Sequence, residues 1–107
     1  MSLDVSLSKV MKTEVYSANI THNLAEMAIA VGIYEALWQP QIIKVKYANE
    51  LIPTLTEGLK NLKSNPTYYK TFNAENGRGT YDDFIRFVEE YLNACKENPD
   101  AKVEADV

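Results

Sequence analysis

The feature that most constrains the fold of this chain is an apolar stripe at helical spacing in its last third. Its members recur every three or four positions: Phe84, Val88, Tyr91, Leu92 and Cys95. That spacing puts them on one face of a helix, which must pack against the rest of the protein. Thr80, followed three residues later by Asp83, has the arrangement of a capping box, and Pro99 ends the segment. The longest helix is therefore predicted between these limits.

Weaker helical patterns precede this stripe. We expect helical segments over residues 19–32, 33–38, 49–65 and 66–72. Gly32 is a natural helix stop, Pro40 ends the short second segment, and Pro53 is compatible only with a first turn. Gly58 lies inside the third segment, where glycine costs up to about 1 kcal/mol relative to alanine. Its presence there indicates a close neighbour.

Strand signals are concentrated at the two ends of the chain. Residues 1–9 carry little pattern and are a candidate disordered segment, whereas 10–18 have the composition of a short strand. Residues 101–107 alternate apolar and charged side chains, and 43–47 read equally as an edge strand or an extended connection. We predict a mainly α (α+β) domain over 1–107, with four or so amphipathic helices and a small sheet of short terminal strands. The C-terminal strand would pair with the N-terminal one or with its copy in another subunit, which favours a homo-oligomer.

Composition and charge limit the cellular location and the classes of partner that we expect for this protein. The net charge is −4, so long-range attraction to duplex nucleic acid is missing. No apolar run approaches the length that spans a bilayer, and no basic, apolar leader opens the chain. One cysteine cannot form an internal disulfide. We expect a cytoplasmic protein with no membrane partner.

Signatures of catalysis are scarce. One histidine and one cysteine are too few to form a typical zinc site of histidine and cysteine ligands. No phosphate-loop, dinucleotide-binding or nucleophile-elbow motif is present. Cys95 falls on the apolar helix face, which indicates core packing. We therefore expect a non-enzymatic protein with no cofactor and no metal.

Two polar segments, 18–24 and 76–81, each lead into a predicted helix. A helix start offers unpaired N–H groups that bind anions, and the guanidinium of Arg78 suits phosphate. The candidate ligand-binding residues are Asn19, Thr21, His22, Asn23, Arg78, Gly79 and Thr80. The alternative is that the same residue types only cap helices and form turns. Trp38 and Tyr81 are candidates for stacking on a ligand ring, or for core packing.

A resemblance to a known family follows from these segments. The residues that carry it are Ala18 to Leu24, Met27-Ala28, Gly32-Ile33-Tyr34, Leu37-Trp38 with Pro40, Phe72-Asn73, Asn76 to Tyr81, Phe84, Tyr91-Leu92 and Ala94-Cys95. The pattern resembles a family of small uncharacterised phage and bacterial proteins, over residues 15–107. Tryptophan is usual in that family where this chain has Arg78. The resemblance implies a phage or mobile-element context, and it transfers no catalytic residues.

Three functions remain open from the sequence. By analogy of size and setting with phage anti-defence sponges, the leading hypothesis is a protein that sequesters a nucleotide-derived immune signal, such as a cyclic nucleotide or an ADP-ribose derivative. The first alternative is a protein-interaction module that inhibits a host factor through an acidic or aromatic surface. The second is a small hydrolase of such signals that uses His22.

Overall fold

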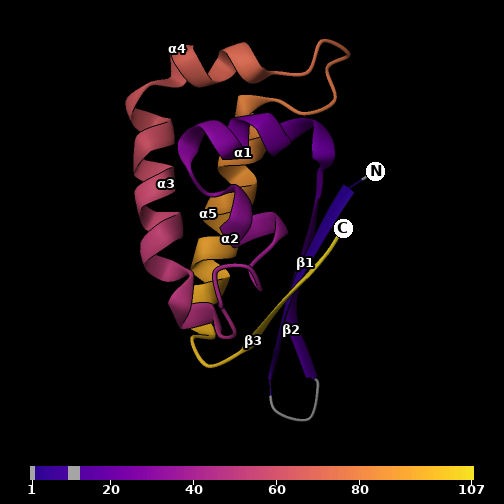
Figure 1. The fold of residues 1–107 in the computed structure, drawn as a ribbon, viewed down its shortest axis with the longest axis vertical. Coiled ribbons are helices and arrows are strands. Elements are labelled where there is room, and N and C mark those ends of the chain that lie inside the picture. The colour runs from indigo at the N-terminus through magenta and orange to yellow at the C-terminus, as the bar shows by residue number, and fades with distance from the viewer. Residues whose placement is uncertain (1, 10–12) are drawn as a thin grey trace.

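A computed structural model describes residues 2–9 and 13–107 (Figure 1). In chain order its elements are β1 (Ser2–Lys9), β2 (Thr13–Thr21), η2 (His22–Leu24), α1 (Ala25–Val31), α2 (Tyr34–Trp38), η3 (Ala48–Glu50), α3 (Ile52–Ser64), α4 (Pro66–Tyr69), η4 (Lys70–Phe72), α5 (Tyr81–Glu97) and β3 (Lys102–Asp106). The helices gather on one side of the three strands (Figure 1).

The sheet is antiparallel, with strand order β2-β1-β3. β1 is therefore the central strand, although its residues were predicted to carry little structure. The signal that was missed is strict alternation, with buried Leu3, Val5 and Leu7 on one face and serines and Asp4 on the other. The C-terminal strand pairs with β1 within the same chain, and not with the 10–18 segment predicted as its partner.

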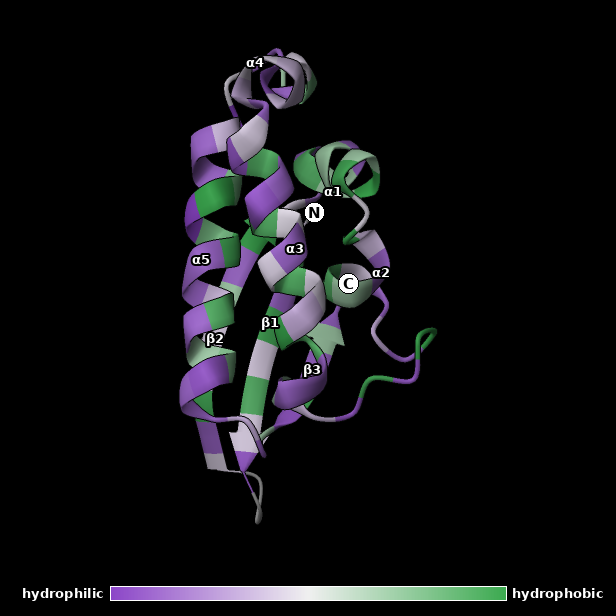
Figure 2. Ribbon diagram, turned by 90° about the vertical axis from the view of Figure 1, so that its left-hand side faces the viewer, coloured by the Kyte–Doolittle hydropathy of each residue, from purple (hydrophilic) through white to green (hydrophobic). Residues whose placement is uncertain are grey.

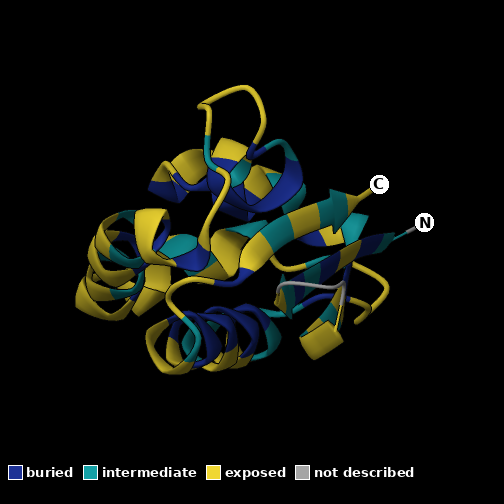
Figure 3. Ribbon diagram, turned by 90° about the horizontal axis from the view of Figure 1, so that it is seen from below, coloured by how far each residue is buried: buried dark blue, intermediate teal, exposed yellow. Residues whose placement is uncertain are grey.

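The helical layer covers one face of this sheet. α5 packs against β2 and runs beside α3 (Figure 2). The buried residues face inward between the helices and the strands, whereas the outer sides of the helices are exposed (Figure 3). The α5 stripe predicted from the sequence supplies much of this core, and Phe84, Val88, Tyr91 and Cys95 are all fully buried.

Local signals placed several helix ends correctly, although residues 19–21, predicted as the start of the first helix, belong to β2. Gly32 has a positive φ of 85° and ends α1, as predicted. Pro53 lies in the first turn of α3, and Thr80 with Asp83 forms the capping box of α5. The close neighbour indicated for Gly58 is Ile33, because a Cβ on Gly58 would lie 2.5 Å from the Ile33 Cγ2 atom.

The predicted fold class is wrong. The protein is α+β, with a three-stranded antiparallel sheet as a full structural layer. Its two longest strands, of eight and nine residues, form the N-terminal hairpin. The sheet is therefore not a small addition of short terminal strands to a mainly helical domain. The error follows from the missed central strand, without which the remaining strand signals had no common partner.

Over the described part of the chain, none of the helices combines the length and the apolar character needed to cross a bilayer.

Candidate functional site

The two polar segments singled out from the sequence lie against each other. The Asn23 side-chain amide donates a 2.8 Å hydrogen bond to the carbonyl oxygen of Arg78. Gly79 is buried with a positive φ of 115°, and a Cβ there would lie 2.9 Å from Thr21 Cγ2. Only glycine fits this left-handed, crowded position without strain. We call the contact between Thr21–Leu24 and Arg78–Thr80 the helix-start junction.

Several backbone donors at and beside this junction are bonded within the protein. Thr80 Oγ1 accepts a hydrogen bond from the Asp83 N–H at 3.2 Å, and Asp83 Oδ2 accepts one from the Thr80 N–H at 3.3 Å. The N–H of Tyr81 donates to Asn73 Oδ1 at 2.7 Å, and Thr21 Oγ1 accepts from the Asn23 N–H at 3.2 Å. Capping therefore accounts for residue types that also suited an anion site.

A polar hollow of about 650 Å³ lies beside the junction. His22 and Asn23 line it together with residues 71–76, and so do the carboxylates of Glu26 and Glu75. Arg78 is not among its lining residues, and its side chain is exposed. A phosphate in this hollow would face two carboxylates and no arginine. His22 and Arg78 therefore do not line a common hollow here, a point that the sequence left open.

The two aromatic candidates are core residues. Trp38 is 3% exposed and stacks on Tyr34, with ring centroids 5.4 Å apart. Tyr81 is 7% exposed, and its hydroxyl donates a 2.7 Å hydrogen bond to the carbonyl oxygen of Leu62. Desolvation by burial raises the pKa of Tyr81 above its ordinary value. Neither ring offers a free face to a ligand.

His22 also turns inward. Its ring centroid lies 6.1 Å from that of Trp38, and its Nε2 atom is buried with no hydrogen-bond partner among the described residues. The chain has no second histidine, and Cys95 is buried on α5, where desolvation raises the pKa of its thiol to about 12. Across the residues that the structure places, no three histidine, cysteine or acidic side chains are grouped so as to hold a metal ion.

Asn19 belongs to another surface. Its side-chain amide donates to Ser2 Oγ at 2.8 Å and to Asp4 Oδ1 at 2.7 Å. All three residues lie on the side of the sheet that faces away from the helices. We call this side the outer sheet face, and it consists of Ser2, Asp4, Ser6, Ser8, Glu14, Ser17, Asn19, Thr21, Lys102, Glu104 and Asp106.

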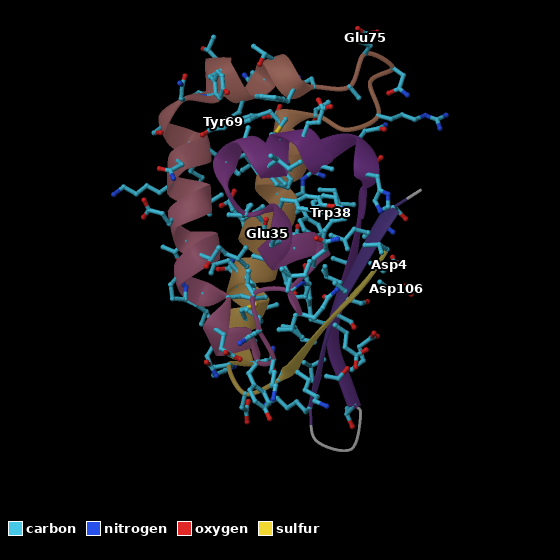
Figure 4. All side chains as sticks on the ribbon, viewed as in Figure 1. Asp4, Glu35, Trp38, Tyr69, Glu75 and Asp106 are labelled. Atoms are coloured by element: carbon cyan, nitrogen blue, oxygen red, sulfur yellow. The ribbon has the colours of Figure 1, made fainter. Side chains whose placement is uncertain are left out.

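The strand register arranges these side chains in rows. Asp4 pairs with Asn19 on β2 and with Asp106 on β3, so two carboxylates stand directly opposite each other. In the next row Ser6 pairs with Ser17 and with Glu104. Asp4 and Asp106 point away from the helical layer in Figure 4. Like charges in a cross-strand pair are destabilising, so this row is not explained by the stability of the sheet.

The outer sheet face is acidic and hollowed. Four carboxylates share it with one lysine, Lys102. Asp4, Glu14, Glu104 and Asp106 also line a concave region of about 770 Å³. Among the residues that the structure describes, none of the four forms an ion pair. The sequence analysis missed this face together with β1, although the alternation of Ser2 to Ser8 was the available signal.

Comparison of the chain with protein-family models, with curated proteins and with solved structures finds no match. The fold and this surface nevertheless define a structural class. The protein is a two-layer α+β domain whose antiparallel sheet is covered by helices on one face and leaves an acidic face open.

Proposed function

We propose that the protein is a non-catalytic interaction module that binds a cationic protein partner on the outer sheet face. The observation that carries the proposal is the charge of that face, where four carboxylates outnumber one lysine and Asp4 stands opposite Asp106. A lysine- or arginine-rich surface would neutralise these carboxylates and relieve their repulsion. Electrostatic complementarity of this kind steers partners together and selects among them.

The shape of the face supports the same partner class. Its concave region spans all three strands, which suits a protein segment laid across the sheet. Apart from Asn19 and Lys102, the side chains of the face are short hydroxyls and carboxylates, so an approaching chain meets hydrogen-bond acceptors on all three strands. An antiparallel sheet can leave one face to water. Exposure of the outer sheet face to solvent is therefore ordinary. Its excess of negative charge is what favours a basic partner.

The helix-start junction supports a phosphate ligand less well. Asn23, Asn73 and Thr80 hold backbone groups at and beside it, and Glu26 and Glu75 line the neighbouring hollow without Arg78. Sequestration of a nucleotide-derived signal, hydrolysis using His22, a phage context and a homo-oligomeric state all stay predictions. The strands do not require a second copy for pairing, because β1 pairs with both β2 and β3 within the chain.

The test uses a fluorescein-labelled deca-lysine peptide as the cationic probe, with binding followed by fluorescence anisotropy. The variant carries Asp4→Asn, Glu104→Gln and Asp106→Asn. A matched control carries Glu35→Gln, Glu57→Gln and Glu97→Gln, which removes the same number of charges from exposed helical positions. The two variants share one net charge, so a difference between them reports the position of the carboxylates.

We expect peptide affinity to fall at least tenfold in the sheet variant and less than twofold in the control. Binding of the wild type should weaken as salt is raised. Equal affinities for the two variants, or no binding by the wild type, would contradict the proposal. A parallel thermal-shift assay with ADP-ribose and a cyclic dinucleotide tests the other hypothesis, because ligand at 100 times its Kd adds about 2.7 kcal/mol of stability.

A further inference from the structure

The turn between α2 and η3 presents two adjacent isoleucines to solvent. Ile42 is 59% exposed and Ile43 is 42% exposed, and Tyr47 beyond them is 44% exposed. In Figure 2 this segment projects from the body of the protein, at the right of the view. Scattered single apolar residues on a surface are ordinary, but grouped ones mark interaction sites. We call residues 41–47 the apolar turn.

Backbone hydrogen bonds fix the conformation of the apolar turn. The N–H of Ile42 donates to the carbonyl of Gln39 at 3.0 Å, and the N–H of Val45 donates to that of Pro40 at 3.0 Å. Lys44 has a φ of 60°, and it is the one described residue other than glycine with a positive φ. A lysine in this region is strained, and such strain persists where the surrounding structure holds it. The isoleucines are thus displayed by a bonded turn.

The charges within the apolar turn are opposite in sign to the net charge of the whole protein. Lys44 and Lys46 lie within it, and residues 39–49 contain no aspartate or glutamate. The nearest carboxylate in sequence, Glu50, accepts hydrogen bonds from the backbone N–H groups of Lys46 and Tyr47, at 2.9 and 2.8 Å. These bonds lower the pKa of Glu50. The chain has a net charge of −4, yet it carries a local cationic and apolar corner.

We propose that the apolar turn docks the protein on an anionic lipid surface, with Ile42 and Ile43 inserted among the acyl chains and Lys44 and Lys46 at the headgroups. Tyr47 has the amphipathic character that favours the membrane interface. Apolar insertion combined with lysine attraction is the pairing that gives peripheral membrane binding. The inference concerns a membrane surface and not a spanning segment, so it departs from the sequence-based expectation of no membrane partner.

Shape favours lipid over a protein partner. A stable protein interface buries about 800 Å² on each side and needs complementary packing. A projecting turn of seven residues offers a tip, which is too small for such an interface. A lipid surface can accept it, because lipid chains rearrange around an inserted side chain. The base of the apolar turn joins the edge of the sheet, where the N–H of Val103 donates to the carbonyl of Lys46 at 2.9 Å and Tyr47 pairs with Lys102. Ile42 and Ile43 lie outside this contact, on the part of the turn that projects from the body of the protein (Figure 2).

The test is co-sedimentation with vesicles of phosphatidylcholine alone and of phosphatidylcholine with 30 mol% phosphatidylserine, roughly the charge of an anionic leaflet. The variant Ile42→Ser with Ile43→Ser should reduce the partition coefficient on the mixed vesicles at least tenfold. Ile29→Ser is the matched control, because Ile29 on α1 is also 59% exposed but lies outside the apolar turn. It should leave partitioning unchanged.

A second variant isolates the charges. Lys44→Asn keeps a residue type that tolerates a positive φ, and with Lys46→Gln it removes both cations. We expect at least a tenfold loss on the phosphatidylserine vesicles only, at about fivefold per lysine. If the wild-type protein stays in the supernatant with both kinds of vesicle, the inference is overturned. That result is the one expected if the apolar turn docks on another protein. An equal loss in Ile29→Ser also overturns it. The triple variant of the outer sheet face should still bind vesicles, which keeps this test separate from the proposed function.

Discussion

Two polar regions of this protein use similar residue types in opposite ways. At the helix-start junction, Asn23, Asn73 and Thr80 each hold a specific backbone group of the same chain. On the outer sheet face, Glu104 and Asp106 have no hydrogen-bond or ion-pair partner among the described residues. Polar residues that are bonded internally position the chain, while those left facing solvent with one sign of charge are available to a partner. The difference favours the outer sheet face over the helix-start junction as the candidate for function.

The largest loss of stability is expected at Gly79, in the helix-start junction. Gly79→Ala should destabilise the protein by about 2–4 kcal/mol, because it combines an unfavourable positive φ with a Cβ 2.9 Å from Thr21 Cγ2. Urea denaturation measures the loss. Gly77→Ala is the control, since Gly77 also has a positive φ but nothing lies within 4 Å of its Cβ position, and it should cost about 1 kcal/mol. Equal costs at the two glycines would show that the junction is not tightly packed.

A smaller effect is expected at the cap of α5. Thr80→Ala removes the oxygen that accepts from the Asp83 N–H and should cost about 1 kcal/mol of unfolding free energy. Thr80→Ser keeps the hydroxyl and should cost only a few tenths of a kcal/mol. Peptide binding on the outer sheet face should be the same in both variants. If Thr80→Ala is as stable as the wild type, solvent replaces the cap. The hydrogen bonds at the junction would then contribute less to stability than their distances indicate.

The smallest effect has the opposite sign. Asp106→Asn removes one of the two facing carboxylates and should stabilise the protein by a few tenths of a kcal/mol at low salt. Screening in 1 M NaCl should abolish the gain, because the Debye length falls to about 3 Å. The same variant should bind the deca-lysine peptide more weakly than the wild type. A substitution that raises stability and lowers binding would identify a carboxylate kept for recognition, whereas a loss of stability would show that Asp106 has a structural role.

The accuracy of the sequence-based predictions differed between local and non-local features. The helix boundaries at Gly32 and Thr80 and the close approach at Gly58 were predicted correctly, because each depends on backbone geometry or on neighbours along the chain. The central strand was missed, although Leu3, Val5 and Leu7 alternate with polar residues. Of the two roles left open for Trp38 and Tyr81, core packing is the one observed. The spacing of aromatic residues could not decide between them, because burial depends on which elements pack over a ring.

The amino-acid sequence by itself determined the amphipathic faces, the caps and the turns, since these follow from side chains that meet within a few residues. Only the tertiary structure decided which polar groups remain free. Strand register brings Asp4 opposite Asp106 across 102 positions of sequence, and the same folding turns His22 onto Trp38 and away from Arg78. Hydrogen bonding and burial are set by neighbours in space, and on the outer sheet face those neighbours come from opposite ends of the sequence.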